Sequence, residues 1–181
     1  MSIGDDYKYL IDSNCFITAK NSYYNPDFCS QFWNVIRQLH TKNILYSIDK
    51  VKNELLNGEE NDYARVYIAQ DDFFKDMWLK TSIASSGYKK VIIEAENWKN
   101  RNSAKREKAF FEFMQENNAD AHLLAMAYEG GYTIITQETS SEAAANKRIK
   151  IPDIANKLGI NYCNLFAILQ RYCDTNFSLK N

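Results

Sequence analysis

The chain has 181 residues, a formal net charge of −1 at pH 7 and a sequence pI near 6.1. This length is typical of one compact domain, and the near-neutral charge excludes an overall basic field, so nucleic acid would have to be held by local Lys and Arg residues or by metal ions. Hydrophobic residues make up 45% of the chain while Gly and Pro are scarce, which predicts an ordered, helix-rich globule.

The cysteines and the N-terminal residues bear on the cellular compartment. Cys15, Cys29, Cys163 and Cys173 lack the close pairing of a zinc knuckle, so we expect reduced thiols. The opening MSIGDDYKYLID has neither a basic nor an apolar signal region, and no stretch approaches the ~18 apolar residues that a membrane-spanning helix needs. We therefore expect a soluble, cytoplasmic protein.

The first half of the chain predicts strands that are followed by helices. An apolar, β-rich run begins at Tyr7 and stops at polar residues after Ile11, and apolar residues recur at helical spacing from Pro26 to about Leu39. A second strand at 44–48 leads into a short helix in DKVKNELLNG. Between 62 and 117 the pattern is helical almost throughout.

The second half continues this alternation. ADAHLLAMAYEGG predicts a helix that the two glycines end, and the β-branched run YTIIT predicts a third strand. IPDIANKLG predicts a helix with Pro152 near its start and Gly159 past its end, before a strand in INYCN and a helix in LFAILQRY. Strands alternating with helices predict an α/β fold whose parallel sheet is covered on both faces.

Four acidic residues lie near the predicted strand ends. In an open parallel sheet, the functional crevice lies at the carboxyl ends of the strands. Asp12 follows the first strand directly, Glu138 comes shortly after the third, and Glu54 lies in the first turns after the second. Asp120 opens the helix that packs against this sheet.

Taken singly, each acid has an ordinary structural explanation. Asp12 would cap a turn, Asp120 would meet its helix dipole, Glu54 would be solvated, and Glu138 would form an exposed acidic pair with Glu142. Gathered in one partly desolvated crevice, however, four carboxylates repel each other strongly unless a cation neutralises them. Hard oxygen ligands favour Mg²⁺ or Mn²⁺, which suits the hydrolysis of phosphodiester bonds.

Four segments together resemble the PIN-domain (PilT N-terminus) nuclease family, in their order and their spacing. They are LIDSNCFI at 10–17, VKNEL at 51–55, ADAHLLAMA at 119–127 and TIITQE at 133–138. The resemblance implies a three-layer α/β/α sandwich with a mainly parallel central sheet. It also implies a Mg²⁺- or Mn²⁺-dependent endoribonuclease that leaves a 3′-hydroxyl and a 5′-phosphate.

The resemblance also assigns roles to individual residues. The first three acidic positions and the two accessory polar positions of the family are matched by Asp12, Glu54, Asp120, Asn14 and Thr136. The acids would be catalytic metal ligands, and the polar residues would orient them. The fourth acidic position, commonly Asp, is Glu138, whose side chain is longer by one methylene and has more rotamers to freeze.

Small bacterial members of this family are often toxins of type II toxin–antitoxin pairs, similar to the VapC type. This implies an RNA substrate, a cognate antitoxin protein and a homodimer. The alternatives are a PIN-like nuclease of RNA processing or DNA metabolism and a non-catalytic binding module. The chain is longer than such toxins, and we interpret the surplus as a helical insertion around 62–117 within one domain of residues 1–181.

A basic stretch within the proposed insertion is a candidate for substrate binding. Its members are Lys99, Arg101, Lys105 and Arg106. They would either contact substrate phosphates or belong to an ordinary solvated helix face, which the interleaved Glu107 favours.

Aromatic residues and one histidine are further candidates. Tyr23, Tyr24, Trp78 and Trp98 would either stack on unpaired bases or pack in the core or at a dimer surface, and packing is the preferred interpretation. His122 comes two residues after Asp120 and so points to a different helix face, which predicts a structural role.

Overall fold

The computed structural model describes residues 7–60, 62–83, 85–99, 104–140, 148–174 and 176–180. Within these residues, five parallel strands form one sheet in the order β3-β2-β1-β4-β5. The strands are β1 (Tyr9–Ile11), β2 (Leu45–Ile48), β3 (Trp78–Leu79), β4 (Thr133–Ile135) and β5 (Tyr162–Cys163). The predicted parallel sheet is confirmed.

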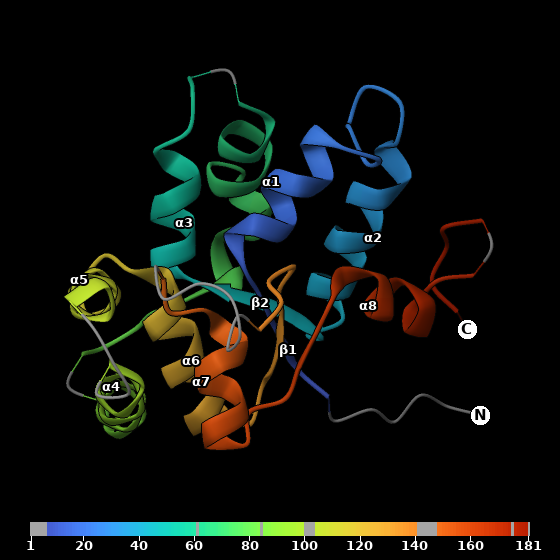
Figure 1. Cartoon of the computed structure of the whole chain (residues 1–181). Coiled ribbons are helices and arrows are strands. Elements are labelled where there is room, and N and C mark those ends of the chain that lie inside the picture. Colours follow the sequence, from blue (N-terminus) through green and yellow to red (C-terminus); the bar gives the residue numbers. More distant parts are fainter. Residues whose placement is uncertain are drawn as a thin grey trace.

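Helices cover both faces of the sheet and complete a three-layer α/β/α fold (Figure 1). One outer layer contains α1 (Ser13–Asn21), α2 (Ser30–Thr41) and α8 (Leu165–Tyr172). The other contains α4 (Ser86–Lys99), α5 (Ala104–Phe113), α6 (Ala119–Gly130) and α7 (Ile151–Leu158). After β2, the connection to β3 runs through α3 (Asp49–Leu56), a π-helical segment η1 (Ala64–Ala69) and a 3₁₀ helix η2 (Asp72–Met77).

The central strands are buried on both faces, which explains their unbroken apolar sequences. Leu10 and Ile11 of β1 and Ile134 and Ile135 of β4 have no exposed surface. Gly131 and Gly159 end α6 and α7 in the left-handed conformation at φ 68°, as the sequence predicts. None of the described helices is long and apolar enough to cross a membrane.

The structure differs from the sequence-based expectation at three places. Helix α1 was not predicted, and α2 begins at Ser30 instead of Pro26. The stretch 62–117 is mostly helical among its described residues, but it also contributes the edge strand β3, which pairs with β2. Part of this stretch therefore belongs to the central sheet.

The order in which successive strands are added to the sheet reverses at β1, and the candidate site lies there. From β1 the strand order runs to β2 on one side and to β4 on the other. Ile11 pairs with Ile135, and Ile135 pairs with Cys163, so the chain leaves β1, β4 and β5 at one level of the same edge. In open α/β sheets, ligands bind at such a topological switch point.

Candidate functional site

Asp12 is the centre of the hydrogen-bonded part of the site. It occupies the N-cap position of α1, but its side chain makes no capping hydrogen bond. Its fully buried carboxylate instead accepts from Thr136 Oγ1 at 3.1 Å and from Asn14 Nδ2 at 3.3 Å, and the Ser13 Oγ lies 3.3 Å from it. The capping explanation therefore fails, and Asn14 and Thr136 lie beside Asp12 as expected.

Ser13 joins Asp12 to Glu54. The buried Ser13 hydroxyl lies 2.6 Å from Glu54 Oε2 and donates to it, so the start of α1 holds the half-buried carboxylate of α3 in place. Sequence reasoning gave Ser13 no role. The available signal was its position between two predicted site residues, directly after the first strand.

Asp120 lies in the first turn of α6 and is almost fully buried. The N-cap of this helix is Asn118, whose side chain accepts from Ala121 N at 3.1 Å, so Asp120 is not needed as the cap. Its Oδ2 instead accepts a hydrogen bond from Arg148 Nη2 at 3.0 Å. Arg148 was not predicted, because a contact between residues so far apart in sequence leaves no local pattern.

Glu138 is held between β4 and α7. Its backbone N–H donates to Thr136 Oγ1 at 3.2 Å, and its Oε2 accepts from the backbone N–H of Ile151 at 2.9 Å. Thr136 therefore connects Glu138 to Asp12 through one hydroxyl group. The alternative acidic pair involves Glu142, which lies outside the described residues.

The four carboxylates act on one another through their charges. Burial, followed by the charges of Asp120, Glu138 and Glu54, raises the pKa of Asp12 to about 7, although the hydrogen bond from Thr136 opposes the shift. Burial also raises the pKa of Asp120, Glu54 and Glu138, and the charge of Asp120 adds to the last two shifts. The structure thus brings together all four acids that the sequence singles out.

Arg148 faces this acidic cluster of Asp12, Glu54, Asp120 and Glu138. Burial lowers the pKa of the guanidinium, but the charges of Asp120, Glu138 and Asp12 outweigh it and raise the pKa overall. The side chain of Arg148 is 59% exposed, whereas that of Asp120 is 5% exposed. One positive charge therefore approaches the buried acids from the solvent side.

The donor chemistry of the cluster fits a hard divalent cation. Carboxylate oxygens are the ligands that Mg²⁺ and Mn²⁺ prefer, and a cation would relieve the repulsion that raises these pKa values. Among the described residues, no three His, Cys, Asp or Glu side chains are already gathered around one point. Binding would therefore draw the acidic side chains inward and compete with Arg148 for Asp120.

The predicted phosphate-binding cations have partners on α4 and α5. Lys99 forms an ion pair with Glu96 at 3.8 Å and lies over the ring of Phe110. Arg106 donates to the Trp98 carbonyl at 2.9 Å and stacks on its ring. The other two members of the basic stretch are Arg101 and Lys105. Arg101 and the side chain of Lys105 lie outside the described residues.

The aromatic residues that were candidates for stacking on bases differ in their burial. Trp78 is buried in the core, and Tyr24 stacks on Phe32 with ring centroids 4.4 Å apart. Tyr23 is 80% exposed. Packing therefore accounts for Trp78 and Tyr24, as the preferred interpretation has it.

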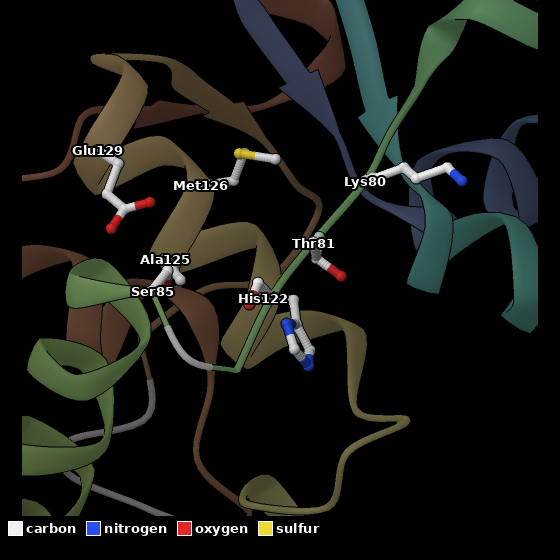
Figure 2. Close-up of a pocket in the computed structure, with 8 residues that line it drawn as sticks. Lys80, Thr81, Ser85, His122, Ala125, Met126 and Glu129 are labelled. Atoms are coloured by element: carbon white, nitrogen blue, oxygen red, sulfur yellow. The ribbon is translucent and has the colours of Figure 1, made fainter.

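His122 lines a small pocket of about 100 Å³ between α6 and the segment 80–85. Figure 2 shows the imidazole projecting from α6 beside Thr81, while Lys80 points away from it. The ring contacts Tyr88 at 4.8 Å between centroids, and Nε2 lies 3.1 Å from the Glu116 carbonyl. His122 takes no part in the acidic cluster and packs between elements, as expected.

The fold and the cluster define an α/β/α protein with an acidic centre at its topological switch point. The chain belongs to the family described as a domain of unknown function (DUF4411), whose model matches residues 9–175. All four acids, Ser13 and Arg148 lie within the matched range. No curated protein and no solved structure matches the chain.

Proposed function

We propose that this protein is a Mg²⁺- or Mn²⁺-dependent endoribonuclease of the PIN-domain type. The observation that supports it most is the coupling of four buried or half-buried carboxylates where β1 and β4 end, with the pKa of Asp12 raised to about 7. A protein keeps such repulsion when the acids serve a cation, because a purely structural role is met by neutral residues at lower cost.

In this proposal Asp12, Glu54 and Asp120 would hold the cation, and Glu138 would support it or an adjacent water. The chemistry that a bound cation would supply there is the activation of a water molecule and the stabilisation of charge on the phosphate and the leaving oxygen. Thr136 and Asn14 keep the Asp12 carboxylate in one orientation through their hydrogen bonds, and Ser13 does the same for Glu54.

Metal binding and RNA cleavage test this proposal together. We expect the wild-type protein to bind Mn²⁺ and to cleave single-stranded RNA only when Mn²⁺ or Mg²⁺ is added. Asp12→Asn preserves the shape of the side chain and removes its charge. The affinity for Mn²⁺ and the rate of RNA cleavage should therefore both fall at least about 100-fold. The matched control is Asp27→Asn, which changes an exposed Asp outside the cluster.

The outcomes separate the candidate functions. Absence of Mn²⁺ binding, together with equal RNA levels after incubation with wild type and Asp12→Asn, would leave the non-catalytic binding module. Cleavage of DNA flaps in preference to RNA would favour a nuclease of DNA metabolism.

The biological role that we propose is that of a cytoplasmic toxin, held inactive by a cognate antitoxin and acting as a homodimer. The support is the resemblance of the four motif segments to PIN-domain toxins. Expression of the wild-type chain should arrest bacterial growth, whereas Asp12→Asn should not, and a small protein encoded beside it should restore growth. Normal growth with an active nuclease would favour RNA processing.

A further inference from the structure

A second cavity opens directly beside the acidic cluster. Its volume is about 330 Å³, and it lies where β4 and β5 end. The residues that line it are Thr136, Gln137, Glu138, Thr139, Ser140, Tyr162, Cys163 and Asn164. Thr136 and Glu138 belong to the acidic site as well, so the cavity and the cluster share one wall. The volume lies in the range of about 300–1,000 Å³ that small-molecule pockets occupy.

The chemistry of the lining selects a neutral polar ligand. Of the described residues that line the cavity, none is Lys, Arg or His, and Glu138 contributes negative charge, so a phosphate group is a poor occupant. Amides and hydroxyls predominate instead, and these groups both donate and accept hydrogen bonds. This is the complement that the edge of a nucleobase requires.

Two residues of the lining are open to a ligand. Within the described part of the chain, the side-chain amide of Gln137 makes no hydrogen bond, although it lies between the site residues Thr136 and Glu138. Tyr162 is 37% exposed and offers its ring from the edge strand β5. An amide that reads a base edge and an aromatic ring that stacks on the base face are the usual elements of single-strand recognition.

We propose that this cavity binds one unpaired nucleobase of the RNA, in the nucleotide next to the phosphate that is cut. The inference rests on the proposed nuclease function and adds how the substrate is recognised: one unpaired base, read at its edge by Gln137 and stacked on by Tyr162. A paired base presents its edge to its partner and cannot enter, so RNA duplexes are excluded.

A cleavage profile on randomised single-stranded RNA tests the reading of the base. The wild type should prefer one base, or one pair of bases, at a position adjacent to the cut. Gln137→Leu keeps the size of the side chain and removes the amide, so that preference should fall by roughly 5-fold or more through KM, while kcat changes little. Gln115→Leu, at an exposed position outside the cavity, is the control and should leave the profile unchanged.

The stacking ring has its own matched pair of variants. Tyr162→Leu should raise KM for single-stranded RNA by roughly 5-fold or more, because stacking contributes about 1–3 kcal/mol per base. Tyr128→Leu replaces a tyrosine of similar exposure on α6 and should not change KM. An unchanged base profile in Gln137→Leu, together with an unchanged KM in Tyr162→Leu, would overturn the proposal.

Binding of the four neutral ribonucleosides provides a readout that does not need cleavage. In amide NMR spectra of the metal-free protein, at least one nucleoside should shift the signals of 136–140 and 162–164, and Tyr162→Leu should weaken this effect. If RNA is cleaved but no nucleoside shifts these signals, the pocket proposal fails and the nuclease stands. If nucleosides bind here but RNA is never cleaved, the nuclease proposal fails while the base pocket stands.

Discussion

The guanidinium of Arg148 donates a hydrogen bond to the carboxylate of Asp120 at 3.0 Å. Its charge acts on Glu138 and Asp12 as well. Arg148 therefore places a positive charge beside the acids, and under the proposed function a divalent cation would compete with it for Asp120.

Arg148→Gln should accordingly bind Mn²⁺ several-fold more tightly than the wild type, because a competing positive charge is removed. The metal-free variant should lose about 1 kcal/mol or less of stability at pH 8, since the half-exposed guanidinium is screened by solvent. Calorimetric Mn²⁺ titration and denaturant unfolding measure the two effects, and Arg148→Lys, which keeps the charge, is the control. Weaker Mn²⁺ binding by Arg148→Gln would mean that the guanidinium helps to form the metal site.

The raised carboxyl pKa values predict how stability depends on pH. The pKa of Asp12 is about 7 in the folded protein against 3.8 in the unfolded chain. Between these values the folded state binds a proton that the unfolded state has lost, so stability falls as pH rises through this window. The contribution of Asp12 protonation to the stability of the folded state is fully present below about pH 4 and is lost above pH 7.

Metal-free wild type should therefore melt at a lower temperature at pH 8 than at pH 6.5, by several degrees. Asp12→Asn should flatten this slope and melt on the order of 5 °C higher than wild type at pH 8. Burial lowers the pKa of His122, which acts with the opposite sign and weakens the protein as pH falls below about 6.5. Measurements in a His122→Asn background separate the two contributions to the slope of melting temperature against pH. An equally steep slope in Asp12→Asn would contradict the assignment of this pH dependence to Asp12.

Ser13 positions Glu54 through a 2.6 Å hydrogen bond from the start of α1. In Ser13→Ala, the Glu54 carboxylate loses the bond that lowers its pKa, so this pKa should rise further and Mn²⁺ affinity should fall roughly 10-fold. Ser13→Thr retains the hydroxyl and should restore most of the affinity. An Ala variant with unchanged affinity and an altered melting temperature would show that Ser13 serves the fold alone.

Glu138 should contribute less to metal binding than the other acids, because one of its oxygens already accepts from Ile151 N–H. Glu138→Gln keeps this acceptor and should weaken Mn²⁺ binding up to about 10-fold, against about 100-fold for Asp120→Asn. Glu138→Asp is too short to reach Ile151 in the same way and should lower the melting temperature instead. Titrations of all three variants would rank the acids directly, and equal losses for Glu138 and Asp120 would make Glu138 a full ligand.

The sequence predicts the parts of the fold that repeat a local pattern. Four strands and the helices that follow Ile48, Asn118, Lys150 and Asn164 are readable because apolar periodicity and glycine stops coincide there. Strand β3 is only two residues long, Trp78–Leu79, and becomes a strand by pairing with β2. Helix α1 was missed because only three apolar side chains of its nine residues, Cys15, Phe16 and Ala19, are buried, which leaves a short helical pattern.

The candidate site likewise contains residues that a local sequence pattern predicts and contacts that it does not predict. Asp12 and Glu138 are predictable because a parallel sheet places its strand ends at one edge, and the resemblance of short segments to PIN-domain nucleases adds Glu54 and Asp120. The contact between Arg148 and Asp120 depends on how α7 packs beside α6, and the cavity beside Glu138 depends on the pairing of β4 with β5. Such contacts arise from tertiary packing, which no window of local sequence contains.

The basic residues of α4 and α5 provide the last prediction, because the sequence left two interpretations open. Arg106 bonds to the Trp98 carbonyl and stacks on its ring, which favours a structural role over phosphate binding. Arg106→Gln should therefore lower stability by about 1 kcal/mol and leave the salt dependence of RNA binding unchanged. Lys108→Gln, which removes a charge from the exposed face of α5, is the control for charge alone. A reduced salt slope in Arg106→Gln but not in Lys108→Gln would instead place α5 against the RNA backbone and extend the substrate path from the acidic cluster onto this helix.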